Sequence, residues 1–135
     1  MVGQTIPMLL TAAGRAFLAY CPDEQRAQIL DLARGGGDDQ ARLAADERFV
    51  ANILARTRES GFASNDGEWT SQRKVGALAL PIRLRQRPVG SVNIVYLNRA
   101  VTLKEAVRRY LPALQKAASR IEAQLAGTPP ASAAS

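Results

Sequence analysis

The sequence predicts an α+β domain in which helices pack around a central antiparallel sheet. Two observations support this fold class. Apolar residues recur at three- and four-residue spacing in the first half of the chain and near its end, and they alternate in between. The chain has 135 residues, enough for one domain with one core, since domains commonly run from about 50 to 200 residues.

Three helices are expected before the sheet. The first spans Met8–Tyr20, where apolar residues form a single stripe. The second opens at Pro22, which suits a first helical turn, and ends at the three glycines that start with Gly35. Asp46 is expected to cap the third helix, and Gly61 to end it.

The period then changes from that of a helix to that of a strand. Ala63–Ser71 is expected to be a polar loop that carries one large apolar residue, Trp69. Val75–Leu84 and Val89–Leu97 predict two strands, which a short connection at Gln86–Pro88 joins into a hairpin.

A long helix is expected to close the domain. Thr102 and Glu105 have the spacing of a capping box at its start. Pro112 lies inside this helix and is expected to bend it, because proline lacks the amide that the helix requires. The domain is therefore expected to span 1–127, with 128–135 as a disordered tail of low complexity.

Alternation divides the residues of the two strands between two faces. The bulky face, expected to form a core with the last helix, holds Leu78, Leu80, Ile82, Leu84, Val92, Ile94 and Tyr96. The small, partly polar face holds Val75, Ala77, Ala79, Ser91, Asn93 and Val95. Small-molecule pockets combine apolar walls with a few polar groups in this way. The alternative is a solvated face, but that would favour Lys, Glu and Thr over Ala and Val, so we favour a pocket.

The start of the first helix can complete such a pocket. Its first turn, Leu9–Thr11, offers amides and a hydroxyl, which suit a carboxylate. Ala12, Ala13 and Gly14 keep the adjoining surface open. The alternative is that these small residues let two elements pack closely, and the pattern alone does not separate the two interpretations.

The net charge of +6 raises the question of nucleic-acid binding. The one concentrated basic set, Arg83, Arg85 and Arg87, has no interleaved aromatic residues, and aromatics make up 5% of the chain. A base-stacking platform is therefore not expected, and a solvated basic surface is the better interpretation. No apolar run approaches the roughly 18 residues of a membrane span, and no signal peptide pattern opens the chain.

Residue composition restricts the chemistry available. The sequence has no histidine, and Cys21 is its one cysteine. Common zinc and haem sites, an internal disulfide and the familiar catalytic triads are therefore not expected, nor is any cofactor, and a reducing cytoplasm is the expected location. An enzyme acting on small acids through Thr11, Ser91 or Tyr96 is the weaker alternative, because an unassisted hydroxyl is a poor nucleophile.

Four stretches resemble the effector domain of IclR-type bacterial transcriptional regulators. Val2–Ala19 resembles the family's signature helix, with Arg15 where lysine is usual. Arg58–Phe62, Ala77–Ile82 and Gly90–Ile94 resemble later motifs in the same order. Each motif is weak by itself, but their order along nearly the whole chain is specific.

Within the family, the sequence is most similar to the MhpR-like activators of hydroxyphenylpropionate degradation. The stretches that carry this similarity are Pro7–Ala12, Asn65–Trp69, Asn93–Tyr96 and Leu111–Gln115. The resemblance implies a GAF-like sensor domain that is not an enzyme and that binds a small organic carboxylate, expected to be aromatic. A homo-oligomer is expected, and no membrane partner.

The resemblance further implies which residues contact the ligand. Carried onto matching positions, these are Met8, Thr11, Gly14, Asn65, Trp69, Val75, Ala77, Asn93 and Val95. The four strand positions in this set coincide with the small face that alternation predicts. Trp69 is expected either to line the pocket or to form a small core contact beneath its loop. Asn93 stands where many members have serine, so the ligands of other members do not transfer directly.

The family's DNA-binding domain, its interdomain helix and the first strands of its effector domain normally precede the motif at Val2. The chain is therefore expected to be a partial effector domain, whose regulator contacts DNA only through an N-terminal domain outside this sequence. Missing strands would leave a sheet edge open to pairing, so a dimer or larger species is expected. A dimerisation module without a ligand is the alternative function.

Overall fold

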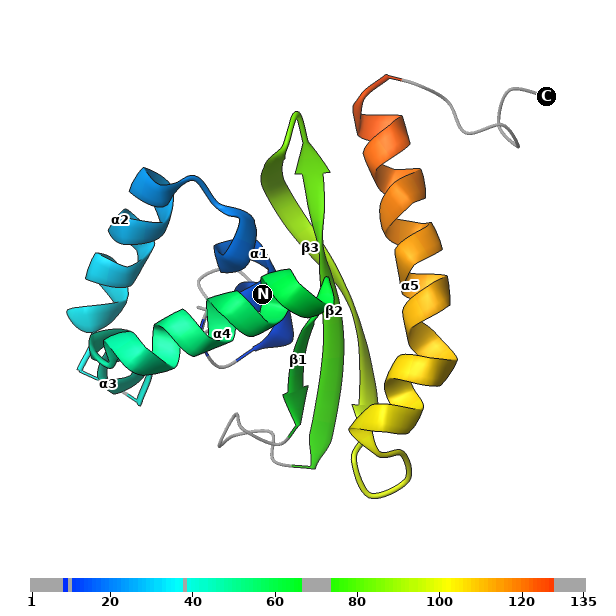
Figure 1. Cartoon of the computed structure of the whole chain (residues 1–135), viewed down its shortest axis with the longest axis horizontal. Helices are drawn as coiled ribbons and strands as arrows, with labels where there is room; N and C mark the ends of the chain where they lie inside the picture. The colour runs from blue at the N-terminus through cyan, green and yellow to red at the C-terminus, as the bar shows by residue number, and fades with distance from the viewer. Residues whose placement is uncertain (1–8, 10, 38, 67–73, 128–135) are drawn as a thin grey trace.

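The structure, a computed structural model, describes residues 9, 11–37, 39–66 and 74–127. In these residues a three-stranded antiparallel sheet, ordered β1-β2-β3, has helices on both faces (Figure 1). The elements are α1 (Ala12–Tyr20), α2 (Asp23–Arg34), α3 (Asp39–Ala45), α4 (Glu47–Ser60), β1 (Ala63–Asp66), β2 (Val75–Leu84), β3 (Arg87–Leu97) and α5 (Leu103–Leu125). The predicted α+β class with an antiparallel sheet is confirmed.

The bulky face of the sheet packs against α5, as predicted (Figure 1). The buried residues of this core are Leu78, Leu80, Ile82, Tyr96, Ala106, Leu114 and Ala118. Val92 and Ile94 pack against it from β3, whereas Leu84, beside the hairpin turn, is only half-buried. Burial of this apolar surface is the main stabilising contribution on this side of the sheet.

Helix α1 lies on the small face of the sheet. Ala12 and Ala16 of α1 form a buried cluster with Ala63 of β1 and Ala79 of β2. Alanine side chains let the helix backbone approach the strands closely, so close packing explains part of the small-residue run. On its outer side, α1 contributes to a second core with α2, α3 and α4, in which Leu18 is fully buried.

The first helix begins at Ala12, so the predicted start at Met8 is wrong. Thr11 has extended backbone, with φ −115° and ψ 148°, and its side chain accepts a hydrogen bond from the Gly14 amide at 3.1 Å. Thr11 is thus the N-cap. Leu9 is buried although it precedes the helix, and its amide donates to the Gln40 side chain at 3.1 Å. Burial before the helix continues the apolar stripe, so periodicity alone marks the start too early.

The segment that was expected to be a loop begins with a strand. Ala63–Asp66 forms β1, in which Ala63 pairs with Ala79 and Asn65 with Ala77. Asn and Asp have low strand propensity, so the strand depends on pairing with β2. Helix α3 was not predicted either. Its seven residues are too short to show a clear period.

The predicted hairpin is confirmed, but its turn is tighter than expected. Leu84 pairs with Arg87, which leaves Arg85 and Gln86 as a two-residue turn with φ of 54° and 70°. Positive φ at both positions is the requirement of a type I′ turn, which Asn-Gly usually fills. The sequence lacks that signal. The predicted connection therefore starts one residue and ends two residues after the observed turn, and β3 starts at Arg87 rather than Val89.

The predicted start and end of α4 and the predicted start of α5 agree with the structure. Asp46 caps α4 through the Phe49 amide at 3.1 Å, and Gly61 ends α4 with a left-handed φ of 84°. Thr102 and Glu105 form the predicted capping box, and α5 continues through Pro112. Within the described residues, no helix has both the length and the hydropathy needed to cross a membrane.

Candidate functional site

A cavity of about 230 Å³ lies between the start of α1 and the small face of the sheet. Its lining residues are Thr11, Ala12, Asn65, Val75, Gly76, Ala77, Asn93 and Val95. They come from the start of α1 and from all three strands. The small face is therefore a cavity wall at this point, where side chains are short enough to leave space.

Six of the nine predicted ligand-contacting residues line this cavity: Thr11, Asn65, Val75, Ala77, Asn93 and Val95. Gly14 does not, because it is buried within the first turn of α1, where its amide donates a hydrogen bond to the Thr11 side chain. Met8 and Trp69 lie outside the described residues.

Two lining residues, Ala12 and Gly76, were not among the predicted ligand contacts. Ala12 was expected to keep the surface beside the pocket open, and it directly follows the N-cap Thr11. Alternation would place a side chain at position 76 on the bulky face of the sheet. Because Gly76 has no side chain, it is its backbone that lines the cavity. Alternation assigns side chains to faces, and it therefore carries no signal for a glycine.

The walls of the cavity are mostly apolar, and its polar groups are neutral. Val75, Ala77 and Val95 provide apolar surface, whereas Asn65, Asn93 and Thr11 provide hydrogen-bonding groups. Asn65 is buried on β1, and Asn93 is exposed on β3. A carboxamide both donates and accepts hydrogen bonds, so this lining can bind a hydroxyl or a carboxylate.

The positive end of the α1 dipole lies at the same cavity. Thr11 and Ala12 are the N-cap and the first residue of α1, and both line the space. The first amides of a helix lack an intrahelical acceptor, and the helix dipole favours negative charge beside them. This arrangement suits the binding of a carboxylate even though none of the described side chains that line the cavity is charged.

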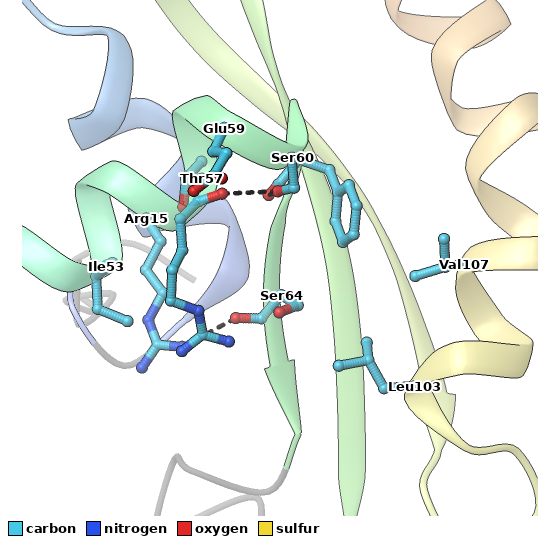
Figure 2. A pocket seen from close by; sticks show the side chains of 10 residues that line it. Arg15, Ile53, Thr57, Glu59, Ser60, Ser64, Leu103 and Val107 are labelled. Carbon is cyan, nitrogen blue, oxygen red and sulfur yellow. Dashed lines mark hydrogen bonds between the residues drawn. The ribbon is translucent and has the colours of Figure 1, made fainter.

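Helix α1 is attached to both outer strands. The Ser91 hydroxyl of β3 donates to the Ala13 carbonyl at 2.9 Å. On the other side, Arg15 donates from Nη1 to the Ser64 carbonyl of β1 at 2.9 Å (Figure 2) and from Nε to the Leu9 carbonyl at 2.9 Å. Arg15 is only 2% exposed. Ser91 thus positions α1 over the cavity rather than lining it.

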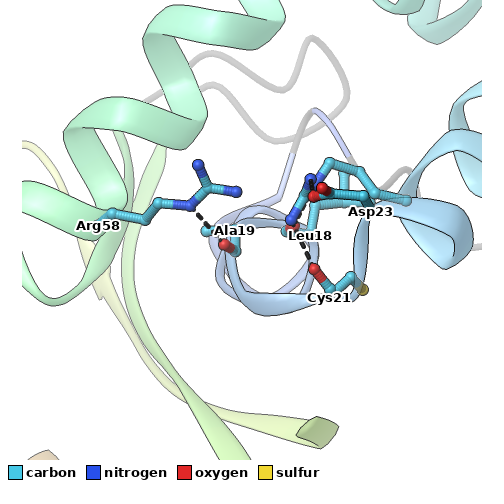
Figure 3. Close-up of polar contacts among 6 residues, drawn as sticks. Leu18, Ala19, Cys21, Asp23 and Arg58 are labelled. Atoms are coloured by element: carbon cyan, nitrogen blue, oxygen red, sulfur yellow. Dashed lines mark hydrogen bonds and ion pairs between the residues drawn. The ribbon is translucent and has the colours of Figure 1, made fainter. Parts of the chain in front are cut away.

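The other end of α1 is held by two further arginines. Arg58 of α4 donates from Nε to the Ala19 carbonyl at 2.7 Å (Figure 3). Arg26 of α2 donates from Nε to the Leu18 carbonyl at 2.8 Å. Guanidinium groups satisfy carbonyls that have no helical partner and interact favourably with the negative end of the helix. The helix that forms the roof of the cavity is therefore fixed at both ends.

The hydroxyls that were considered as nucleophiles do not converge. Thr11 caps α1, Ser91 donates to Ala13, and Tyr96 is buried in the core beneath α5. Cys21 is buried beyond the far end of α1, and burial raises the pKa of its thiol, which disfavours the reactive thiolate. The cavity thus has the features of a binding site.

Comparison with known families shows to which family this domain belongs. Residues 1–123 match the C-terminal domain of the bacterial transcriptional regulator IclR.

The chain belongs to the IclR C-terminal domain family.

It is thus an effector-binding domain of the IclR family. The members of this family are transcriptional regulators and not enzymes. The predicted family resemblance is confirmed at this level, whereas the MhpR-like subgroup remains a prediction.

Solved structures share this fold. An IclR-family regulator from Brucella abortus has 22% identity and a TM-score of 0.73, over 92% of this chain and 46% of its own. An IclR regulator from Alicyclobacillus acidocaldarius has 27% identity and a TM-score of 0.69, over 90% of this chain and 47% of its own. This IclR domain therefore spans about half the length of these regulators.

A third similar structure contains a ligand. It is a double mutant of the inducer-binding domain of the transcription factor PobR from Acinetobacter, in complex with 3-hydroxybenzoic acid. Its identity is 17% and its TM-score 0.69, over 90% of this chain and 69% of its own. At this identity, the similarity shows the fold alone.

Proposed function

We propose that this IclR domain binds a small aromatic carboxylate in the cavity beneath α1, and that its regulator responds to that ligand. The observation that carries the proposal is that predicted ligand-contacting residues from separate parts of the sequence line the same cavity. Thr11, Asn65 and Asn93 come from three distant segments, and together with the three apolar residues predicted beside them they line one cavity. A solvated sheet face would not be enclosed by a helix terminus.

The cavity fits a ligand with three parts. The carboxylate would lie at the first amides of α1, where the helix dipole is positive. The ring would contact Val75, Ala77 and Val95, and a hydroxyl on the ring would reach Asn65 or Asn93. The volume of about 230 Å³ lies below the range of about 300–1,000 Å³ that is usual for drug-sized ligands, so a single-ring acid is the better fit.

The complex of the PobR double mutant supports the same chemical class, because its 3-hydroxybenzoic acid carries one carboxylate and one hydroxyl on a single ring. The resemblance to MhpR-like activators points to hydroxyphenyl acids as well. We propose further that the IclR domain, spanning 1–127, acts in a cytoplasmic homo-oligomer and that a separate N-terminal domain of the regulator contacts DNA.

Thermal unfolding with a panel of acids tests the proposal. We expect 3-hydroxybenzoate to raise the melting temperature saturably, because a ligand that binds only the native state adds about 2.7 kcal/mol at 100 times its Kd. The neutral analogue 3-hydroxybenzamide should stabilise far less, since it lacks the charge that the helix terminus favours.

A variant with a filled cavity is the matched control. Ala77→Leu places a larger side chain in the cavity and should abolish stabilisation by 3-hydroxybenzoate. If no aromatic acid stabilises the unmodified chain, the alternative of a dimerisation module without a ligand is the correct one. The same titration followed by fluorescence tests Trp69: a saturable change supports its place in the pocket, and no change supports a core contact.

A further inference from the structure

A second and larger cavity lies at the outer edge of β1. It occupies about 430 Å³, which falls within the range of about 300–1,000 Å³ that is usual for small-molecule sites. Residues of α4, β1 and the first two turns of α5 line it (Figure 2). It has no lining residue in common with the cavity beneath α1.

One end of this second cavity is apolar. Leu103 and Val107 lie one turn apart on α5 and point toward β1 (Figure 2). Phe62, which directly precedes β1, completes this part of the lining, whereas Ile53 of α4 lies on the side of Arg15 (Figure 2). Both aliphatic and aromatic surfaces are therefore available to the body of a ligand.

The other end is polar and carries excess positive charge. Among the residues that the structure describes, Arg15 and Arg56 line it together with one acidic residue, Glu59. Arg15 is held in place by the Leu9 and Ser64 carbonyls, so its charge is fixed beside the cavity. Arg56 is exposed on α4, and its guanidinium forms no ion pair with any residue in the described part of the chain.

The two cavities are separated by β1 itself. Successive strand residues point to opposite faces, so Ser64 lines the second cavity while Asn65 lines the cavity beneath α1.

We propose that this cavity is a second small-molecule site, which takes an amphipathic monoanion. The head group, a carboxylate or sulfonate, binds Arg56, since a planar guanidinium matches such anions with paired hydrogen bonds. The apolar body contacts Phe62, Leu103 and Val107. The net charge of +6 favours the approach of an anion.

A fluorescent amphipathic anion, 8-anilinonaphthalene-1-sulfonate, tests this site on the whole chain. We expect saturable binding of one dye per chain. Arg56→Gln should weaken it by about tenfold, the effect of losing one charge-assisted hydrogen bond. Arg48→Gln is the matched control, because Arg48 is exposed on the same helix but does not line the cavity. Both variants should melt like the parent, which excludes dye binding to a loosened core.

Filling either cavity distinguishes the two sites. Val107→Phe should weaken dye binding and leave stabilisation by 3-hydroxybenzoate unchanged, whereas Ala77→Leu should do the reverse. The proposal is overturned if the dye does not bind, if Arg56→Gln and Arg48→Gln behave alike, or if Ala77→Leu rather than Val107→Phe removes dye binding. If Val107→Phe does not fold, the comparison of dye binding by Arg56→Gln and Arg48→Gln still tests the proposal.

Discussion

Asn93 and Ile94 are neighbours on β3 whose side chains point to opposite faces of the sheet. Asn93 lines the cavity beneath α1, and Ile94 packs against the core under α5. Asn93→Leu should weaken 3-hydroxybenzoate binding by about tenfold, because a buried ligand group loses its hydrogen-bond partner. Its melting temperature should hardly change. Calorimetric titration and thermal unfolding measure the two effects separately.

The control for this prediction is the adjacent residue. Ile94→Ala should lose about 2 kcal/mol of unfolding free energy as a core truncation, with little effect on affinity. If Asn93→Leu binds normally, or alters only the melting temperature, Asn93 does not contact the ligand.

Gly76 and Tyr96 form a cross-strand pair in which the ring covers the glycine. A Cβ at Gly76 would lie 2.5 Å from Cζ of Tyr96, and Tyr96 is only 7% exposed. Gly76→Ala should therefore cost about 1–3 kcal/mol, as overpacking does. Urea unfolding measures this cost. Gly90→Ala is the control on the same sheet, because its Cβ would have no neighbour within 4 Å, and it should be close to neutral.

At the scale of the element, α5 depends on a local cap. The Thr102 side chain accepts from the Glu105 amide at 3.2 Å, and Glu105 reaches back to the Thr102 amide at 3.4 Å. Thr102→Ala should destabilise the domain by about 1 kcal/mol. Thr102→Ser retains the hydroxyl and should lose much less. Equal losses in chemical denaturation would show that the methyl group, rather than the hydrogen bond, stabilises the helix start.

The same cap makes stability depend on pH. The hydrogen bond from the Thr102 backbone, followed by that from its side chain, lowers the pKa of Glu105. A lowered pKa stabilises the folded state above the unfolded pKa of about 4.3, and this contribution is lost as pH falls through the folded pKa. Glu105→Gln should therefore flatten the acid side of the stability profile. If Glu105→Gln leaves the slope of stability against pH unchanged below about pH 4.3, the loss of stability in acid is due to other carboxylates.

At the scale of the whole molecule, the sheet has open edges. In the described residues, β1 and β3 are the outer strands, and β3 exposes Val95 and Leu97 by 58% and 62%. Unpaired strand edges with apolar side chains favour pairing with another chain. We expect a dimer or larger species by light scattering. Leu97→Lys should shift it toward monomer, since edge lysines oppose pairing, and a monomeric parent chain at high concentration would contradict the prediction.

Features set by neighbouring residues could be predicted well from the sequence. The caps at Asp46 and Thr102 and the end of α4 at Gly61 depend on side chains within a single turn. The two faces of the hairpin follow from alternation alone, which is why the core under α5 and the small face were both identified. The family resemblance was confirmed as well.

Features that depend on distant residues could not be predicted in this way. β1 is a strand because Asn65 pairs with Ala77, and no local pattern in its polar sequence indicates this. The sequence shows Arg15 as an arginine where lysine is usual, but only the fold brings its guanidinium to Ser64, forty-nine positions away.

The sequence by itself determined the fold class, the family and most of the residues beside the cavity under α1, since periodicity and motifs are properties of short stretches. The tertiary structure decided that these residues enclose one space, that Ala12 and Gly76 belong to it, and that a second cavity lies across β1. Cavities form where separate elements fail to fill the volume between them. That volume depends on how the elements pack, which no single stretch of sequence specifies.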